Sequence, residues 1–141
     1  MPSNKKVFLV TGAAGFIGSH MIDYLLKKKL NVIGIDNLEN GRLSNIKHNL
    51  KNNKFKFFKE DIFKINNIKK KIKSIDYIMH FAGLGEVVPS IENPTLYLEQ
   101  NIIGTSKVFD LAREFKIKKF VYAASSSCYG LNNSKISEKD P

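Results

Sequence analysis

The sequence predicts an α/β fold with a parallel, doubly wound sheet. Short apolar runs rich in Val, Ile and Phe alternate along the chain with longer stretches that have the period of a helix. Such alternation implies crossover connections between parallel strands, with helices covering both faces of the sheet. A chain of 141 residues is long enough for one core and too short for two. We therefore expect residues 1–141 to form one domain, with a sheet of about five strands.

Each expected strand is a short apolar run that ends in polar or glycine-containing residues able to form a turn. The runs that meet this description are residues 7–11, 31–35, 55–58, 77–81 and 120–124. A first helix is expected over residues 16–28. The apolar residues expected on one face of it are Ile17, Met21, Tyr24 and Leu25.

The longest expected helix covers residues 94–115. Asn93 is suited to cap its N-terminus, and Pro94 is suited to its first turn. Its apolar residues form two stripes, one of Leu98, Ile102, Phe109 and Ala112 and the other of Val108, Leu111 and Phe115. We expect one stripe to pack against the sheet, which leaves the other for a partner helix.

The composition narrows the class of protein. No apolar run approaches the roughly 20 residues of a membrane-spanning helix, and the N-terminus lacks a signal-peptide cleavage site, so we expect a cytoplasmic protein. The single Cys128 and three scattered histidines predict neither a disulfide nor a metal site. The net charge of +10 comes mainly from lysines spread along the chain, which favours a solvated surface over nucleic-acid binding. The positive field also favours an anionic ligand.

A glycine-rich loop, "VFLVTGAAGFIGSH", joins the first expected strand to the first expected helix. Its Gly12, Gly15 and Gly18 suit a sharp turn, a close approach of the backbone to a pyrophosphate, and close packing of helix on strand. Asp36 ends the next strand, where a carboxylate can bind the ribose hydroxyls of NAD and would repel the phosphate of NADP. These features predict a Rossmann-type fold that binds NAD, although Arg42 nearby weakens the choice against NADP. A tight turn without a ligand is the alternative for the loop, and a cap or turn former is the alternative for Asp36.

Several further segments carry a resemblance. Together with the GxxGxxG spacing, "DNLENG", "EDI", "HFAGLGEVVPS", "NPTLYLEQNIIGT" and "AASSSCYG" resemble the extended short-chain dehydrogenase/reductase family. Within that family the chain looks most like the N-terminal part of UDP-hexose 4-epimerases, including those that act on N-acetylated sugars. The resemblance implies NAD as cofactor, a UDP-sugar as substrate and a homodimer in the full-length form.

The resemblance also implies roles for individual residues. The backbone at Phe16 and Ile17 would meet the pyrophosphate, Asp36 and Asn37 the adenosine ribose, and Asp61 and Ile62 the adenine. The residues expected on the path to the nicotinamide are Phe81, Ala82, Gly83, Leu84 and Asn101. The residues alone also fit purely structural roles. The motif "HFAG" fits a buried strand that ends in a turn of small residues, and Asp61 fits a turn that ends a strand.

The serines after the last expected strand are the implied catalytic end of the site. By resemblance, Ser125 is the hydroxyl that binds the C4 oxygen of the sugar, and Ser127 is a neighbouring substrate contact; structural serines are the alternative, which we favour for Ser126. Related dehydratases carry an Asp-Glu pair where this chain has Ser126 and Ser127, so dehydration is disfavoured. The implied reaction is reversible hydride transfer at C4 through a 4-keto sugar. A reductase, a C5-epimerase and a non-catalytic NAD-binding module remain alternatives.

The catalytic base of the resembled family belongs to a Tyr-x-x-x-Lys motif, which we expect beyond residue 141. The formal match within the chain is Tyr24 with Lys28, on the first expected helix. That helix lies on the pyrophosphate side of the cofactor, so we expect Tyr24 in the core and Lys28 on the surface. The isolated chain is therefore expected to be inactive.

Overall fold

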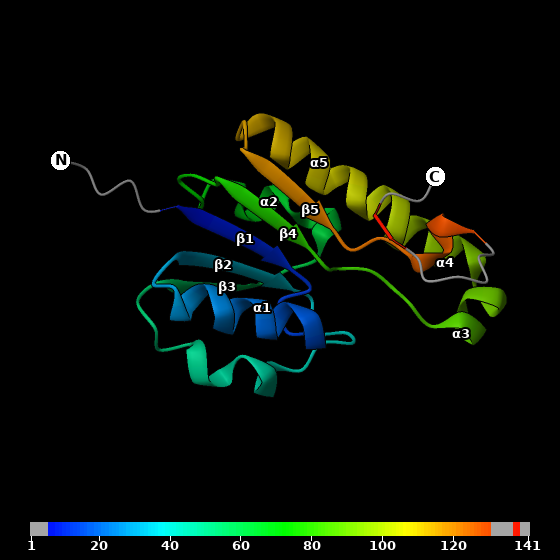
Figure 1. Cartoon of the computed structure of the whole chain (residues 1–141), viewed down its shortest axis with the longest axis horizontal. Helices are drawn as coiled ribbons and strands as arrows, with labels where there is room; N and C mark the ends of the chain where they lie inside the picture. Colours follow the sequence, from blue (N-terminus) through cyan, green and yellow to red (C-terminus); the bar gives the residue numbers. More distant parts are fainter. Residues whose placement is uncertain (1–5, 131–136, 139–141) are drawn as a thin grey trace.

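The computed structural model describes residues 6–130 and 137–138. Its centre is a parallel sheet of five strands in the order β3-β2-β1-β4-β5, shown in Figure 1. The strands are β1 (Val7–Thr11), β2 (Asn31–Asp36), β3 (Phe55–Lys59), β4 (Tyr77–His80) and β5 (Lys119–Tyr122). The predicted fold class and all five predicted strands are confirmed, with differences of at most two residues at their ends. The strand order reverses between β1 and β4, which places the carboxyl ends of these two strands at the crevice of the sheet.

Helices cover both faces of the sheet, with α1 (Phe16–Lys27) on one side and α2 (Asn66–Lys69) and α5 (Gly104–Glu114) on the other (Figure 1). Alternate side chains of β1 point to opposite faces, as strand geometry requires. Phe8 and Val10 belong to the core under α1, and Leu9 belongs to the core under α5. Two short helices, α3 (Val87–Glu92) and α4 (Pro94–Leu98), precede α5 in the chain. Short 3₁₀ turns occupy Leu43–Asn45, Lys47–Asn49, Ile62–Lys64 and Ser126–Tyr129.

The buried face of α1 differs from the predicted one. Ile17 and Tyr24 are 55% and 58% exposed, so the prediction that Tyr24 packs in the core is wrong. The buried residues are Gly18, Ser19, Ile22, Leu25 and Leu26. The reason is the close packing of Gly18 against the glycine loop, which turns the side of the helix that carries Gly18, Ile22 and Leu25 towards the sheet. The Lys28 ammonium lies 5.6 Å from the centroid of the Tyr24 ring, at the surface.

The predicted long helix is present but is not uniformly α-helical. A π-helical segment (Glu99–Ile103) separates α4 from α5, and the linking residues keep right-handed helical dihedrals. Asn93 stands at the N-cap of α4 without a side-chain capping hydrogen bond, so its predicted capping role is wrong. Of the two stripes, Val108 and Leu111 are buried against the sheet, whereas Leu98, Ile102 and Phe109 are about half exposed.

Candidate functional site

A cavity of about 150 Å³ lies where β1 and β4 end. Its lining contains most of the predicted cofactor residues: Gly12, Gly15, Asp36, Asn37, Asp61, Ile62, Phe81, Ala82, Gly83 and Leu84. It also contains residues that the sequence reasoning missed: Ile35, Glu39, Asn40, Gly41, Glu60 and Gln100. Most of these adjoin a residue that was found, because Glu39, Asn40 and Gly41 follow Asp36 in one loop and Glu60 precedes Asp61. A search of the flanks of each motif would have found them.

The three glycines of the loop have different structural reasons. Gly12 has a φ of 64°, and a Cβ there would lie 2.7 Å from the carbonyl carbon of Phe81. A Cβ on Gly18 would lie 2.0 Å from the carbonyl oxygen of Gly12. Gly15 has extended dihedrals, and its Cβ would meet only the Gly12 oxygen within 4 Å, at 3.2 Å. The fold therefore requires glycine at positions 12 and 18, whereas at position 15 it leaves space beside the cavity.

The loop ends at the N-terminus of α1, which begins with Phe16 and Ile17. Both side chains are largely exposed, at 78% and 55%, and neither residue lines the cavity. Their backbone N–H groups belong to the first helical turn, where an α-helix offers donors without partners inside the helix and the positive end of its dipole. Gly18 is buried beneath the loop. The predicted pyrophosphate residues thus divide into a loop that lines the cavity and a helix start beside it.

Asp36 is a buried carboxylate with a defined structural task. Its Oδ2 accepts a hydrogen bond from the Ala14 N–H at 2.9 Å, and its Oδ1 accepts one from the Leu38 N–H at 2.8 Å. A Cβ on Gly41 would lie 2.6 Å from Oδ1, so glycine lets this loop fold over the carboxylate. The turn-forming role considered for Asp36 is therefore present, and the same residue lines the cavity.

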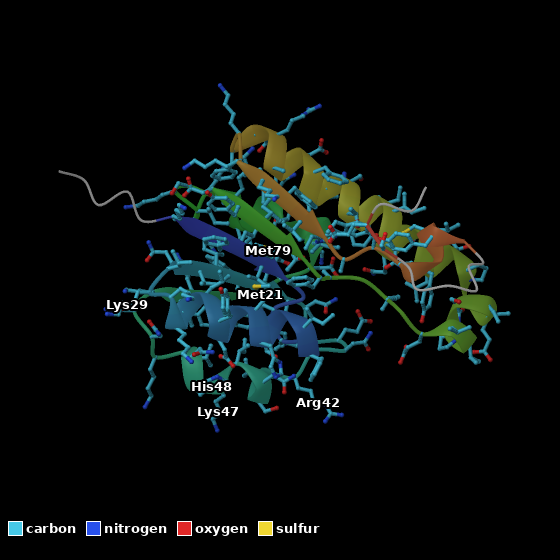
Figure 2. All side chains as sticks on the ribbon, in the orientation of Figure 1. Met21, Lys29, Arg42, Lys47, His48 and Met79 are labelled. Atoms are coloured by element: carbon cyan, nitrogen blue, oxygen red, sulfur yellow. The ribbon has the colours of Figure 1, made fainter. Side chains whose placement is uncertain are left out.

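Further carboxylates surround this end of the cavity. The Asn37 side chain donates to Asp61 Oδ2 and to Glu39 Oε2, each at 3.1 Å. Asp61 also accepts from the Phe63 N–H at 2.8 Å, which is the turn role considered for it. Figure 2 shows the labelled Arg42 side chain pointing outward, away from the sheet, and its backbone N–H donates to the Ala14 oxygen at 3.0 Å. The described lining of this end of the cavity therefore contains carboxylates and amides but not Arg42.

A second cavity, of about 370 Å³, lies at the ends of β4 and β5. Its lining residues are His80 to Gly85, Asn101, Thr105 and Tyr122 to Ser125. Phe81, Ala82, Gly83 and Leu84 line both cavities, and we call these residues the 81–84 strip. Ser125 follows β5 and is exposed, in the position predicted from the end of that strand. Ser127 lies in the 3₁₀ turn after Ser125, and its side chain lies outside the described part of the chain.

Asn101 holds the 81–84 strip from the long helix. Its Oδ1 accepts from the Leu84 N–H at 2.8 Å, and its Nδ2 donates to the Leu84 oxygen at 2.9 Å. Behind the strip, His80 is fully buried between Thr11 and Thr105. Burial lowers the pKa of its imidazole from the usual 6.5 to about 4, which keeps the ring neutral near pH 7. The sequence reasoning missed these three residues, although Thr105 lies one helical turn after Asn101.

The cationic side chains lie elsewhere. Neither cavity includes Lys or Arg among its described lining residues. Figure 2 shows Lys29 and Lys47 pointing outward on the periphery of the molecule. Among residues 6–130 and 137–138, no helix is long and apolar enough to cross a membrane, and no group of three or more His, Cys, Asp and Glu side chains could hold a metal ion. Any phosphate bound at the glycine loop would meet backbone N–H groups in place of cationic side chains.

These features fit a dinucleotide: a glycine loop whose backbone borders the cavity, a helix N-terminus beside it and a buried carboxylate at the end of β2. The sequence matches the model of the NAD dependent epimerase/dehydratase family over residues 8–141. The chain belongs to this family. The predicted family and the predicted cofactor, NAD, are therefore confirmed, since the family is NAD-dependent.

Relatives within the epimerase/dehydratase family are similar along most of this chain. A UDP-glucuronate 4-epimerase from Thermodesulfobacterium geofontis is 38% identical over 132 residues, which cover 86% of this chain and 40% of that protein. A UDP-N-acetylglucosamine 4-epimerase from Methanobrevibacter ruminantium, solved with UDP-N-acetylmuramic acid, has a TM-score of 0.84 at 36% identity, covering 96% of this chain and 43% of that one. A UDP-glucuronic acid 4-epimerase from Bacillus cereus, solved with UDP-glucuronic acid and NAD, has a TM-score of 0.83 at 34% identity, covering 94% and 44%. The chain thus spans about two-fifths of the length of these relatives.

Proposed function

We propose that the chain is the NAD-binding part of a nucleotide-sugar 4-epimerase that acts on a UDP-hexose. The observation that carries the proposal is the 81–84 strip, which lines both the glycine-loop cavity and the cavity that contains Ser125. A cofactor laid across the strip from the first cavity would end beside the serine in the second. The named epimerases among the relatives support the same reaction class.

The residues that would hold NAD line the first cavity or adjoin it. The backbone of the glycine loop and the start of α1 would bind the pyrophosphate, Asp36 and Asn37 the ribose, and Asp61 and Ile62 the adenine. When bound, NAD supplies an acceptor and donor of hydride. The 81–84 strip and Asn101 would exclude water and fix the orientation of the reacting end.

Ser125 is the residue proposed to touch the sugar. Its hydroxyl can donate a hydrogen bond to the C4 oxygen, which would favour the 4-keto form. That form would arise when C4 gives a hydride to NAD and the C4 hydroxyl gives its proton to the tyrosine base expected in the continuation of the chain. Return of hydride to the opposite face of C4 gives the epimer. Ser126 and Ser127 provide no acid and base pair for removing water, which supports epimerisation over the dehydration found elsewhere in the family. Ser127 remains a proposed substrate contact.

The remaining parts of such an enzyme are also proposals. Residues 1–141 would form the cofactor domain, with further strands, a substrate domain and the Tyr-x-x-x-Lys pair in a continuation of the chain. A homodimer and a cytoplasmic location stay predictions. Without the tyrosine, we expect residues 1–141 to bind NAD but not to epimerise UDP-sugars.

The test begins with the DNA downstream of codon 141. The product of the continuous reading frame is assayed with UDP-glucose and UDP-N-acetylglucosamine for the C4 epimer. Ser125→Ala should reduce turnover by at least about a hundredfold, while Ser125→Thr, which keeps the hydroxyl, should retain part of it. A reading frame that stops at codon 141, or turnover that Ser125→Ala leaves intact, would overturn the epimerase proposal and leave a non-catalytic NAD-binding module.

A further inference from the structure

A buried chain of hydrogen bonds passes behind the 81–84 strip. Thr11 Oγ1 lies 2.6 Å from His80 Nδ1, and His80 Nε2 lies 3.0 Å from Thr105 Oγ1. Thr105 Oγ1 in turn donates to the backbone oxygen of Asn101 at 2.6 Å. Thr11, His80 and Thr105 are all less than a tenth exposed. We call these four residues the His80 chain.

The position of every proton in the His80 chain follows from its last member. A carbonyl oxygen only accepts, so the single proton of the Thr105 hydroxyl is committed to Asn101. Towards His80, Thr105 Oγ1 can then only accept, which places the imidazole proton on Nε2. A neutral ring with its proton on Nε2 has a bare Nδ1, which accepts the hydroxyl proton of Thr11. The opposite tautomer would leave two lone pairs facing each other at the contact between His80 and Thr105.

Both ends of the His80 chain lead to the same strip. The Thr11 oxygen, whose proton goes to His80, accepts the N–H groups of Phe81 and Ala82, each at 3.2 Å. At the other end, Asn101 binds both backbone groups of Leu84. The 81–84 strip is thus held at its start from β1 and at its end from the long helix, and His80 joins the two attachments.

The place where the His80 chain meets the long helix is its π-helical segment, which contains Asn101. A threonine hydroxyl bonded to the carbonyl four residues earlier competes with the regular helix ladder, and π segments inside helices often mark functional positions. The bond from Thr105 to Asn101 has this spacing. The local departure from α-helix and the attachment of the strip therefore coincide.

We propose that His80 is a positioning residue which, as the neutral imidazole protonated on Nε2, couples the π-helical segment to the 81–84 strip and so sets the wall of the NAD site. The inference rests on the proposed binding of NAD along this strip. The His80 chain runs from the N–H groups of Phe81 and Ala82 to the backbone oxygen of Asn101, so each of its protons already has an acceptor within the protein. Its task is to fix the strip before the cofactor binds, which lowers the ordering cost of binding.

The first experiment reads the tautomer in the unsubstituted chain. In ¹⁵N NMR of the His side chains, protonated Nε2 and bare Nδ1 resonate far apart, and their order distinguishes the two tautomers. We expect His80 to show the signature of a proton on Nε2 near pH 7. A proton on Nδ1, or a mixture of tautomers, would overturn the proposal, and the measurement needs no substitution.

The second experiment measures coupling with a matched pair of substitutions. Thr105→Val keeps the shape of the side chain and removes the hydroxyl, whereas Thr105→Ser keeps the hydroxyl. With Thr105→Val, the hydrogen bonds of Thr105 to His80 and to the Asn101 oxygen are both lost. We therefore expect the amide resonance of Leu84 to shift and NAD to bind about tenfold more weakly. Thr105→Ser should restore the Leu84 resonance and most of the affinity.

The outcomes separate this inference from the proposed function. If Thr105→Val binds NAD as tightly as the unsubstituted chain, the coupling is overturned while NAD binding stands. If the unsubstituted chain binds no NAD, the proposed function is wrong, and the inference, which rests on NAD binding, is wrong as well. If the coupling is observed but the continuous reading frame yields no epimerase, the positioning role stands and the reaction proposed above is wrong.

Discussion

Gly15→Ala separates what the cofactor needs from what the fold needs. The dihedrals of Gly15, φ −74° and ψ 175°, are accessible to alanine. A methyl group there would meet one atom within 4 Å, the Gly12 oxygen at 3.2 Å, and would otherwise extend into space beside the cavity. Gly18→Ala is the comparison, because its methyl group would lie 2.0 Å from the same oxygen.

The expected magnitudes follow from these contacts. At a compatible position, alanine stabilises by about 0.4–1 kcal/mol because it restricts the unfolded chain, and the tight 3.2 Å contact offsets part of this gain. The free energy of unfolding of Gly15→Ala should therefore change by less than about 1 kcal/mol. For Gly18→Ala the helix must move away from the loop, which costs about 1–3 kcal/mol. A methyl group between the Gly15 backbone and a pyrophosphate should weaken NAD binding more than about tenfold, or about 1.4 kcal/mol.

Urea unfolding gives the stability of both variants, and calorimetric titration with NAD gives their affinities. The expected pattern is a stable Gly15→Ala variant with weak NAD binding and a clearly destabilised Gly18→Ala variant. Unchanged NAD affinity in Gly15→Ala would refute the assignment of the pyrophosphate to this loop. A loss of stability in Gly15→Ala as large as that of Gly18→Ala would refute the steric reasoning.

Three further predictions concern buried or paired side chains. Asp36→Asn should reduce the preference for NAD over NADP in parallel titrations and should cost about 1–2 kcal/mol in urea unfolding, because one of the two bound backbone N–H groups loses its acceptor. Hydrogen bonds from the Lys118 ammonium, which has the larger effect, and from the Val7 N–H hold the pKa of Asp76 below its usual 3.8. The ionised Asp76 therefore stabilises the folded chain above pH 3.8, and this stabilisation is lost as the pH falls through the lowered pKa. The difference in unfolding free energy between the unsubstituted chain and Asp76→Asn should accordingly shrink below about pH 4. His80 is protonated near pH 6.5 in the unfolded chain but only near pH 4 in the folded chain, because burial lowers its pKa. The free energy of unfolding should therefore fall by roughly 3 kcal/mol as the pH falls from 6.5 to 4. An equal fall in His80→Gln would contradict the assignment of this effect to His80.

The elements predicted well are those fixed by local pattern. Each strand is a short run of mostly apolar residues that ends in turn-forming residues, so its position follows from the sequence to within two residues. The glycine loop was predicted for the same reason, since Gly12 and Gly18 sit at fixed offsets between a strand and a helix. In both cases the residues that determine the structure lie within one short segment.

The elements predicted poorly depend on contacts between distant segments. The orientation of α1 follows from the close contact between the backbones of Gly18 and Gly12. The spacing of the apolar residues along the helix does not reveal this contact, and Tyr24 is exposed where that spacing predicted burial. His80 pairs with Thr11 across 69 residues and with Thr105 across 25, so neither threonine was identified from the histidine. The sequence offered His80 as the start of the motif "HFAG" and as a histidine without metal-ligand neighbours, and the fold supplies its two partners.

The distribution of charge leads to a consequence for how the site recognises its ligands. The chain carries a net charge of +10, yet the described lining of both cavities has no Lys or Arg and includes Asp36, Glu39, Glu60 and Asp61. In the proposed binding of NAD, a phosphate at the glycine loop would therefore meet oriented backbone N–H groups and the dipole of α1, whose effect depends on their exact placement. Backbone N–H donors lose their hydrogen bonds to a ligand if the loop moves, whereas a long lysine side chain can change its conformation and keep contact with the ligand. A site of this kind needs a rigid scaffold. The glycine contacts fix the loop that borders the first cavity, and the hydrogen bonds from Thr11 and Asn101 fix the 81–84 strip that borders both cavities.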